Sequence, residues 1–320
     1  MRATDTRRLG RTAVDLTVLG FGGSQVGNLH RPVPEDDAAR AIAAAWDLGV
    51  RYFDTAPLYD HGRGERRMGE ALRGRPRDAY VLSTKVGRLV EPHGIEYDYS
   101  HDGVLRSLED SRKRLGLSRI DVALIHDIDP YNHEAEQPRR FAEAMAGAFP
   151  ALARLRREGV LGAIGIGVNS WRVCQAAAEA VDVDCVLLAG RYTLLEQEAL
   201  AFLSLCERRS IGVIVGAPYN SGILARGAAP GAQHNYAAPS PEIAERVRAL
   251  EAVCARHGVN LGAAALQFPL GHPAVAAVLP GSRDAAQVAA SVRWLDETIP
   301  ADVWRELKSR RLIDAAAPTP

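Results

Sequence analysis

Three strand-like segments end in polar side chains whose types suit proton transfer. Asp54 ends the first segment and Tyr59 follows on the next loop, while Lys85 and His126 end the next two segments. Tyrosine titrates near ~10, so its phenol works close to neutral pH only where a neighbouring cation stabilises the phenolate. Lys85 is the candidate cation, and Asp54 would keep that lysine charged and oriented. With His126 bonded to the substrate oxygen, the four groups predict proton transfer at a carbinol or carbonyl.

The other half of such a reaction is the transfer of a hydride. No side chain accepts a hydride, so we expect a nicotinamide cofactor, NAD or NADP, at the same site. Each residue also has a simpler interpretation: Asp54 as a loop cap, Tyr59 as a rim aromatic, Lys85 as a lysine reaching solvent, and His126 as the partner of Asp127. One shared site is the better hypothesis, because all four groups follow consecutive apolar segments.

A second polar cluster follows the last strand-like segment. Residues 280–283, with the sequence Pro-Gly-Ser-Arg, lead into a helix-like segment that begins at Ala285. Glycine and a helix N-terminus offer N–H groups to a phosphate, and Arg283 could pair with that phosphate or stack on adenine. The alternative is an ordinary loop with an exposed arginine. The glycine-rich segments 20–25 and 165–170 lack the last glycine of a dinucleotide-binding turn.

Alternating strand-like and helix-like segments position these groups. A short hairpin at 8–16 comes first. The expected strands are 18–21, 52–54, 80–85, 120–126, 164–168, 185–188, 212–215 and 276–279. The expected helices are 34–48, 65–72, 103–115, 150–158, 171–180, 196–210, 241–257 and 285–294. Short apolar strands separated by amphipathic helices predict a parallel sheet that is buried on both faces.

The expected fold class is α/β, with a (β/α)8 TIM barrel as its architecture. Eight strand–helix pairs without a Pro/Gly/Ser-rich linker favour one domain over 1–320, with the N-terminal hairpin closing the barrel bottom. The alternative is a Rossmann domain followed by a second domain. Active sites of such barrels lie at the C-terminal ends of the strands, where Asp54, Lys85 and His126 would meet. We expect the tail 315–320 to be disordered.

Composition narrows the classes of partner. The formal net charge of 320 residues is zero, which gives no reason to expect nucleic acid or an anionic membrane surface. No segment is apolar for long enough to predict a membrane span or a signal peptide, so we expect a cytoplasmic protein. We also expect a monomer or a weak homo-oligomer. The cysteines are too scattered for a disulfide framework or a metal knuckle, so we expect no metal and a role in core packing. They are Cys174, Cys185, Cys206 and Cys254.

The ordered motifs of the chain resemble those of the aldo-keto reductase superfamily over nearly the whole length. The matching residues are 53–59 (Phe-Asp-Thr-Ala-Pro-Leu-Tyr), 83–85 (Ser-Thr-Lys), His126, 165–171 (Gly-Ile-Gly-Val-Asn-Ser-Trp), and 280–283 with Gln287. The resemblance implies a (β/α)8 barrel that uses NAD(P). It implies that Tyr59 is the acid/base, that Lys85 and Asp54 tune it, and that His126 orients the substrate.

The resemblance also implies which residues bind the ligands. Asn169 and Ser170 would hold the carboxamide of the cofactor, and Gly281 through Gln287 its adenosine end. The full set of implied cofactor-binding residues is Gly22, Gly23, Asp54, Asn169, Ser170, Pro218, Gly281, Ser282, Arg283 and Gln287. The implied substrate-binding residues are Tyr59, His126, Asp127 and Trp171.

Several positions depart from the common pattern of this superfamily. The order Asn169–Ser170 reverses the familiar one, Ala189 stands where many relatives have a glutamine, and Gly216 where many have a stacking tyrosine. Gln287 occupies a place where an arginine often accompanies a preference for NADPH. This difference favours NAD, while Arg283 keeps NADP as an alternative.

Residues 98–109, 124–127 and 189–195 resemble the aldose dehydrogenase branch of the superfamily. That resemblance implies NAD(P)-dependent oxidation of the anomeric hydroxyl of an aldopyranose, of the L-fucose, L-galactose or D-arabinose type, to the aldonolactone, with Tyr59 as base. The alternatives are a pyridoxal 4-dehydrogenase, a broad-specificity NADPH-dependent carbonyl reductase, and a nucleotide-binding redox-sensing subunit without turnover. The loops expected to choose the substrate are 25–34, 90–98, 128–137 and 221–239.

Overall fold

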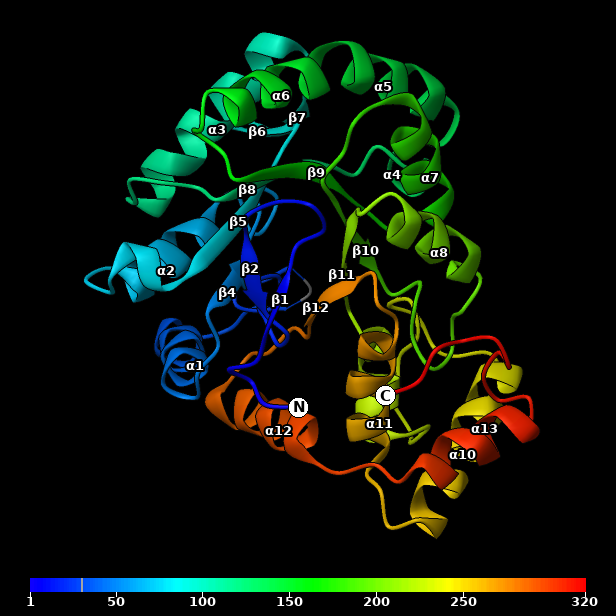
Figure 1. The fold of residues 1–320 in the computed structure, drawn as a ribbon. Helices are drawn as coiled ribbons and strands as arrows, with labels where there is room; N and C mark the ends of the chain where they lie inside the picture. The colour runs from blue at the N-terminus through cyan, green and yellow to red at the C-terminus, as the bar shows by residue number, and fades with distance from the viewer. Residues whose placement is uncertain (30) are drawn as a thin grey trace.

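Eight parallel strands form one sheet at the centre of the molecule, with helices around it (Figure 1). The computed structural model describes residues 1–29 and 31–320, so His30, inside the expected loop 25–34, lies outside the described residues. The strands follow one another in the sheet in the order of the chain. They are β3 (Phe21–Gly22), β4 (Tyr52–Asp54), β5 (Val81–Val86), β8 (Val122–His126), β9 (Ala163–Val168), β10 (Cys185–Ala189), β11 (Gly212–Gly216) and β12 (Val275–Leu279).

The first and last strands of this sheet meet, which closes it into a barrel. Gly20 N donates to Val278 O at 2.9 Å, and Val278 N donates to Val18 O at 2.9 Å. A further parallel bridge joins Gly22 to Gly281. The closed arrangement leaves no open sheet edge. The (β/α)8 architecture expected from the sequence is therefore confirmed.

Eight of the surrounding helices lie where the sequence predicts them, within a few residues. They are α1 (Glu35–Asp47), α2 (Arg63–Leu72), α3 (His101–Leu115), α6 (Phe149–Arg157), α7 (Trp171–Ala180), α8 (Leu200–Arg208), α10 (Pro241–Arg256) and α12 (Ala285–Asp296). Helix α3 shows how the chain sets such limits. The Ser100 side chain accepts a hydrogen bond from Gly103 N at the start, and Gly116 ends the helix with a φ of 62°. These are the roles that serine and glycine favour at helix ends.

Several elements were not predicted. Strands β6 (Arg88–Glu91) and β7 (Gly94–Tyr97) form an antiparallel hairpin where we expected a loop. The unpredicted helices are α4 (Pro130–His133), α5 (Gln137–Glu143) with a π-helical segment at Ala144–Ala148, α9 (Ile223–Arg226), α11 (Leu261–Gln267) and α13 (Ala301–Ser309). Short 3-10 turns lie at Arg77–Ala79, Glu134–Glu136, Asn220–Gly222 and Phe268–Gly271. Every residue of α11 is buried, so its sequence carries no amphipathic period to reveal it.

The N-terminal hairpin, β1 (Thr6–Arg8) and β2 (Asp15–Thr17), covers the end of the barrel opposite the strand C-termini (Figure 1). Leu9 and Leu16 are fully buried in a cluster that fills the barrel interior. Gly10 lies so close to the start of β11 that a Cβ there would be 2.5 Å from Gly212 N, and its φ of 57° also favours glycine. Close packing of this kind supports the expected role of the hairpin as the barrel bottom.

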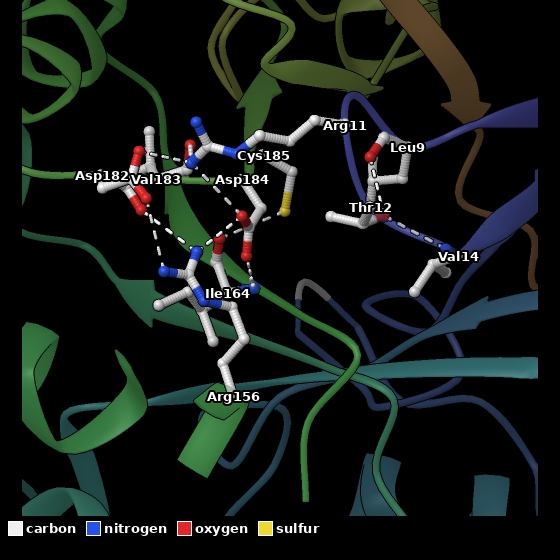
Figure 2. Close-up of polar contacts among 10 residues, drawn as sticks. All are labelled: Leu9, Arg11, Thr12, Val14, Arg156, Ile164, Asp182, Val183, Asp184 and Cys185. Atoms are coloured by element: carbon white, nitrogen blue, oxygen red, sulfur yellow. Dashed lines mark hydrogen bonds and ion pairs between the residues drawn. The ribbon is translucent and has the colours of Figure 1, made fainter. Parts of the chain in front are cut away.

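Charged side chains tie the hairpin loop to the barrel (Figure 2). Arg11 Nη2 lies 2.5 Å from Asp182 Oδ1 and 3.4 Å from Asp184 Oδ1. Arg156 Nη1 donates to the same Asp184 oxygen at 2.6 Å, and Asp184 Oδ2 accepts from Ile164 N at 3.0 Å. The buried Asp184 carboxylate is therefore satisfied by two cations and a backbone N–H, as a buried charge requires.

Two remaining expectations concern the cysteines and the tail. All four cysteines are free and buried, so they pack in the core as predicted. The segment 315–320, which we expected to be disordered, lies against the fold. Ala317 has no exposed surface and belongs to the main core cluster. A Cβ on Gly271 would be 2.8 Å from Pro318 O, which shows how closely the tail packs.

The contact between α2 and α3 leads to a first prediction. A Cβ on Gly69 would lie 1.8 Å from Leu115 O, so Gly69→Ala forces the two helices apart. Alanine is the better helix former by about 1 kcal/mol, and overpacking costs about 3 kcal/mol, so we expect the free energy of unfolding to fall by about 2 kcal/mol. Urea unfolding measures it. Glu70→Ala, at an exposed position of the same helix, should change little; equal stability of the two variants would contradict this packing argument.

Candidate active site

The C-terminal ends of β4 and β5 bring Asp54 and Lys85 into a buried ion pair. Lys85 Nζ donates to Asp54 Oδ2 at 2.7 Å and to Thr55 O at 2.9 Å. The other oxygen of Asp54 accepts from Ser83 Oγ at 2.6 Å, and Ser83 Oγ lies 3.0 Å from Tyr52 OH. These contacts orient the carboxylate and the ammonium and leave little freedom to either.

Tyr59 and His126 complete the group expected from the sequence. Tyr59 lies on the loop after β4, and His126 ends β8; both are buried. Lys85 Nζ lies 5.4 Å from the centroid of the Tyr59 ring. The rings of Tyr59 and His126 meet edge to face, with their centroids 6.4 Å apart. The structure thus brings the four side chains together at one end of the barrel.

The electrostatic state of Tyr59 differs from the expected one. Burial, the largest cause, raises the pKa of the Tyr59 phenol well above its ordinary value, and the charges of Asp54 and Asp127 raise it further. Lys85 donates to Asp54 and to Thr55 O instead, so much of its charge is already balanced. The net pKa of the phenol is therefore raised in this structure, where we expected it to be lowered: burial and the two carboxylates outweigh the charge of the nearby Lys85. The phenol is protonated at neutral pH and can act as an acid.

His126 is a neutral imidazole in this environment. Burial, followed by the charges of Lys85 and Arg88, lowers the pKa of its ring well below the usual value. Its Nδ1 is buried without a hydrogen-bond partner among the described residues, and its Nε2 lies 3.3 Å from Asp127 Oδ2. A neutral ring can give or accept one hydrogen bond at a substrate oxygen, as the expected role requires.

An ion pair beside His126 was not predicted. Arg88 Nη2 donates to Asp127 Oδ2 at 2.5 Å and to Asn132 Oδ1 at 2.8 Å. Burial raises the pKa of Asp127 to about 6, although Arg88 opposes the change. Arg88 belongs to the β6–β7 hairpin, whose presence we did not expect. The sequence signal for this hairpin was a glycine, Gly87, directly after β5. In the structure the chain turns there with a φ of 95°.

Asp129 organises the backbone beside this pair. It has no exposed surface, and it accepts hydrogen bonds from Asn132 Nδ2 at 2.9 Å and from Asn169 N at 2.8 Å. The loops after β8 and β9 are therefore held together by one carboxylate. The sequence signal for Asp129 was the occurrence of two aspartates, Asp127 and Asp129, directly after a strand. We had predicted a role only for Asp127.

The expected carboxamide-binding residues differ in their present contacts. The Ser170 side chain caps α7 by accepting from Val173 N at 3.4 Å. The Asn169 side-chain amide makes no hydrogen bond to the described residues, whereas its backbone N–H is held by Asp129. Of the two, Asn169 therefore has the side chain available for a ligand. Trp171 is partly buried against the core, with Arg172 4.4 Å from its ring centroid, and no described contact joins it to the four central side chains.

The loops after β3 and β12 form a close backbone cradle. A Cβ on Gly22 would lie 3.2 Å from Pro280 O, a Cβ on Gly23 2.7 Å from Asp54 O, and a Cβ on Gly281 2.8 Å from Gln25 Cγ. Pro218, after β11, is buried, as is Ser282. Side chains at these three positions would press on atoms of the neighbouring loops, so glycine lets the backbones of these loops approach each other closely.

Three arginines gather beside this cradle. Arg283 Nε is buried without a partner among the described residues. Burial lowers the pKa of Arg283, and the positive charges of Arg31 and Arg226 lower it further. No ion pair joins any of the three to a carboxylate among the described residues, although the charge of Asp284 offsets part of the lowering at Arg283. Such a concentration of cations is unfavourable unless an anion joins it, so these residues fit the diphosphate of a dinucleotide.

Gln287 is committed to local contacts. Its Oε1 accepts from Arg283 N at 3.1 Å, and its Nε2 donates to Asp284 Oδ2 at 2.9 Å. The Asp284 side chain in turn caps α12. Gln287 therefore shapes the turn before α12.

Two small residues lie opposite each other at the C-terminal ends of β10 and β11. Ala189 and Gly216 pair across β10 and β11, and a Cβ on Gly216 would meet Leu187 Cδ2 at 3.2 Å. The nearby Tyr219 contacts Ser291 Oγ at 3.2 Å through its hydroxyl and meets the Trp294 ring edge-on, so it points toward α12. The ring and the hydroxyl of Tyr219 are thus both engaged with α12.

Neither a membrane span nor a metal site was found in the described parts of the chain. Among residues 1–29 and 31–320, no helix has both the length and the apolar character needed to cross a bilayer. The same residues include no group of three or more His, Cys, Asp or Glu side chains arranged to hold a metal ion.

Comparisons with known proteins agree with this geometry. Residues 18–311 match the model of the aldo/keto reductase family. The chain is 39% identical to pyridoxal 4-dehydrogenase from Microbacterium luteolum, over 98% of this chain and 99% of that protein. It is 38% identical to D-threo-aldose 1-dehydrogenase from a Pseudomonas species, over 95% of this chain and 96% of that protein. Aldo-keto reductase AKR11C1 from Bacillus halodurans, in its holo form, superposes with a TM-score of 0.77 at 26% identity over 98% of each chain.

Proposed function

Because the chain belongs to the aldo/keto reductase family and is an oxidoreductase that uses NAD or NADP, we propose that it oxidises the anomeric hydroxyl of an aldopyranose to the aldonolactone. The substrates we propose are L-fucose, L-galactose and D-arabinose. The observation that carries the redox chemistry is the buried group of Asp54, Lys85, Tyr59 and His126 at the barrel mouth. The similarity to an aldose 1-dehydrogenase over nearly the whole chain supports the sugar.

The side chains divide the work of this reaction. Oxidation removes a proton from the anomeric oxygen, which Tyr59 accepts, and a hydride from C1. Bound NAD(P) supplies the hydride acceptor. The neutral imidazole of His126 bonds to the same oxygen and holds it against Tyr59. Lys85, held by Asp54, places a positive charge beside the Tyr59 ring, where it opposes the cost of forming a phenolate.

We propose that the cradle and the arginine cluster bind the cofactor. Gly22, Gly23, Pro218, Gly281 and Ser282 would line its backbone path. Arg283, with Arg31 and Arg226, would meet the diphosphate, and the free side-chain amide of Asn169 the carboxamide. Gln287 is uncharged and already hydrogen-bonded, so we expect NAD to be preferred over NADP.

The pKa of Tyr59 gives a prediction about pH. Burial and the carboxylates of Asp54 and Asp127 raise this pKa, while Arg88 lowers it in part, so the phenol is protonated at neutral pH. Oxidation needs the phenolate as base, and aldehyde reduction needs the phenol as acid. We expect kcat/KM for oxidation to rise from about pH 7 to about pH 10. Over the same range, kcat/KM for reduction should not rise. Initial rates in both directions across this range measure it; oxidation that slows with rising pH would contradict the assignment.

A pyridoxal 4-dehydrogenase is the second candidate, supported by the similarity to the Microbacterium luteolum enzyme over the whole chain. The deciding experiment offers L-fucose, L-galactose, D-arabinose, pyridoxal and simple aldehydes to the purified protein with each nucleotide. The proposal requires NAD(P)H absorbance to grow with at least one of the sugars. It fails if only pyridoxal or simple aldehydes turn over.

A further inference from the structure

The Arg88–Asp127 pair presents unused hydrogen-bonding groups besides Arg88 Nε, which is buried without a partner among the described residues. Both contacts of the Asp127 carboxylate use Oδ2, which meets Arg88 Nη2 and His126 Nε2. Its Oδ1 has no hydrogen-bond partner among the described residues. In Arg88, Nη2 makes the contacts to Asp127 and Asn132, while Nη1 has no partner in the same part of the chain. An acceptor and a donor therefore remain on one ion pair.

The pair lies beside the reacting centre. Asp127 Oδ2 is 3.3 Å from His126 Nε2, the nitrogen that faces the carboxylate. The charges of Arg88 and Asp127 both act on Tyr59. A substrate that is held between Tyr59 and His126 therefore has the pair next to it.

The pair is also held rigidly, as a recognition group should be. Arg88 Cζ lies 4.7 Å from the Tyr97 ring centroid, and both residues belong to the β6–β7 hairpin. Tyr99 OH donates to His126 O at 2.8 Å and approaches Asp127 O at 3.3 Å. Asp127 itself has a φ of 52°, a conformation that is unfavourable for a non-glycine residue and persists where surrounding contacts require it.

We propose that Arg88 and Asp127 together bind the adjacent hydroxyl groups on C2 and C3, the two ring carbons that follow the reacting carbon, so that they select polyhydroxylated substrates. This inference rests on the proposed oxidation of an aldose and assigns the residues that recognise it. A hydroxyl group both donates and accepts a hydrogen bond. Two neighbouring hydroxyls can give one hydrogen bond to Asp127 Oδ1 and take one from Arg88 Nη1.

The opposite charges of Arg88 and Asp127 favour a neutral ligand over an anionic one. A substrate with a carboxylate or phosphate would meet Arg88 but also the negative charge of Asp127, which disfavours it. A simple aldehyde offers no hydroxyls and would leave Asp127 Oδ1 and Arg88 Nη1 without a hydrogen bond to the ligand. Sites built on hydrogen bonds reject ligands that lack the matching groups for this reason.

The test combines variants of the pair with substrates that lack single hydroxyls. For Asp127→Asn we expect kcat/KM with the parent aldose to fall at least about tenfold. With the deoxy analogue that lacks the recognised hydroxyl, the same substitution should cost less than about threefold. Arg88→Lys keeps the positive charge but not the two-pronged geometry, so it should show the same pattern. Glu96→Gln, which removes a charge from an exposed position of the same hairpin, is the matched control. It should leave kcat/KM unchanged for both the parent aldose and the deoxy analogue.

A second measurement does not depend on sugar turnover. A 1-deoxy sugar lacks the anomeric hydroxyl but keeps the others, so it should inhibit the reduction of a simple aldehyde competitively. We expect Asp127→Asn to raise its inhibition constant at least about tenfold, and because an inhibition constant reports binding alone, this result does not depend on how the substitution changes kcat for the aldehyde. Absence of aldose oxidation in the wild-type protein would refute the proposed function alone. Equal losses for the parent aldose and every deoxy analogue, with an unchanged inhibition constant, would refute the role of Arg88 and Asp127.

Discussion

Replacing Tyr59 with phenylalanine is expected to lower kcat for aldose oxidation by about 10² to 10⁴-fold, with nucleotide affinity unchanged. The substitution removes only the hydroxyl that exchanges the proton and keeps the ring that packs against His126. The Lys85–Asp54 pair does not depend on that hydroxyl, because Lys85 donates to Asp54 and Thr55 O. Initial rates with the best sugar and fluorescence titration with NADH and NADPH measure the two quantities.

Tyr131→Phe provides the matched control for this experiment. Tyr131 is 73% exposed, so the loss of its hydroxyl should not alter turnover. A Tyr59→Phe variant that keeps wild-type kcat would contradict the assigned acid/base. A wild-type protein that binds nucleotide tightly yet turns over none of the sugars, pyridoxal or aldehydes would favour the redox-sensing alternative.

The elements that position the site were largely predictable. Strands β4, β5 and β8 are largely apolar; β4 and β8 end in a polar residue of the site, and Lys85 is the last residue but one of β5. Once the chain is taken as a closed parallel barrel, the ends of adjacent strands must meet at one rim. Asp54, Lys85 and His126 could therefore be placed together from order along the chain alone.

The side-chain contacts within the site could not be predicted in the same way. Spacing placed Lys85 near Tyr59, but whether the ammonium meets the phenol or the Asp54 carboxylate depends on distances of a few ångströms. In this structure Thr55 O accepts a hydrogen bond from Lys85, and Ser83 Oγ donates one to Asp54. These two contacts hold the ammonium against the carboxylate. Their contribution is a matter of local geometry that no pattern of residue types expresses.

The β6–β7 hairpin was missed for a different physical reason. Its two strands have four residues each and are mostly half-exposed, so they lack both a continuous apolar run and a clear alternation. The hairpin derives support from tertiary contacts, among them the stacking of Arg88 on Tyr97 and the pairing of Arg88 with Asp127. Arg88 could be recognised as a site residue only after those contacts were known.

Lys85→Met is expected to lower the free energy of unfolding by about 3 to 5 kcal/mol and to reduce kcat as strongly as Tyr59→Phe. Lys85 and Asp54 are both almost fully buried and lie 2.7 Å apart, so removing the ammonium leaves a buried carboxylate without its cation. Ser83 continues to donate to the other oxygen, which offsets only part of that cost. Urea unfolding and initial rates measure the two effects.

The double variant Asp54→Asn/Lys85→Met separates the two roles of the pair. Removing the carboxylate's charge as well should restore about half or more of the lost stability, because a neutral amide is far less costly to bury than an unpaired anion. It should not restore kcat, since the cation beside Tyr59 is still missing. Recovery of both quantities would show that Lys85 serves only to neutralise Asp54. Recovery of stability alone would assign to its charge a direct effect on the proton transfer at Tyr59.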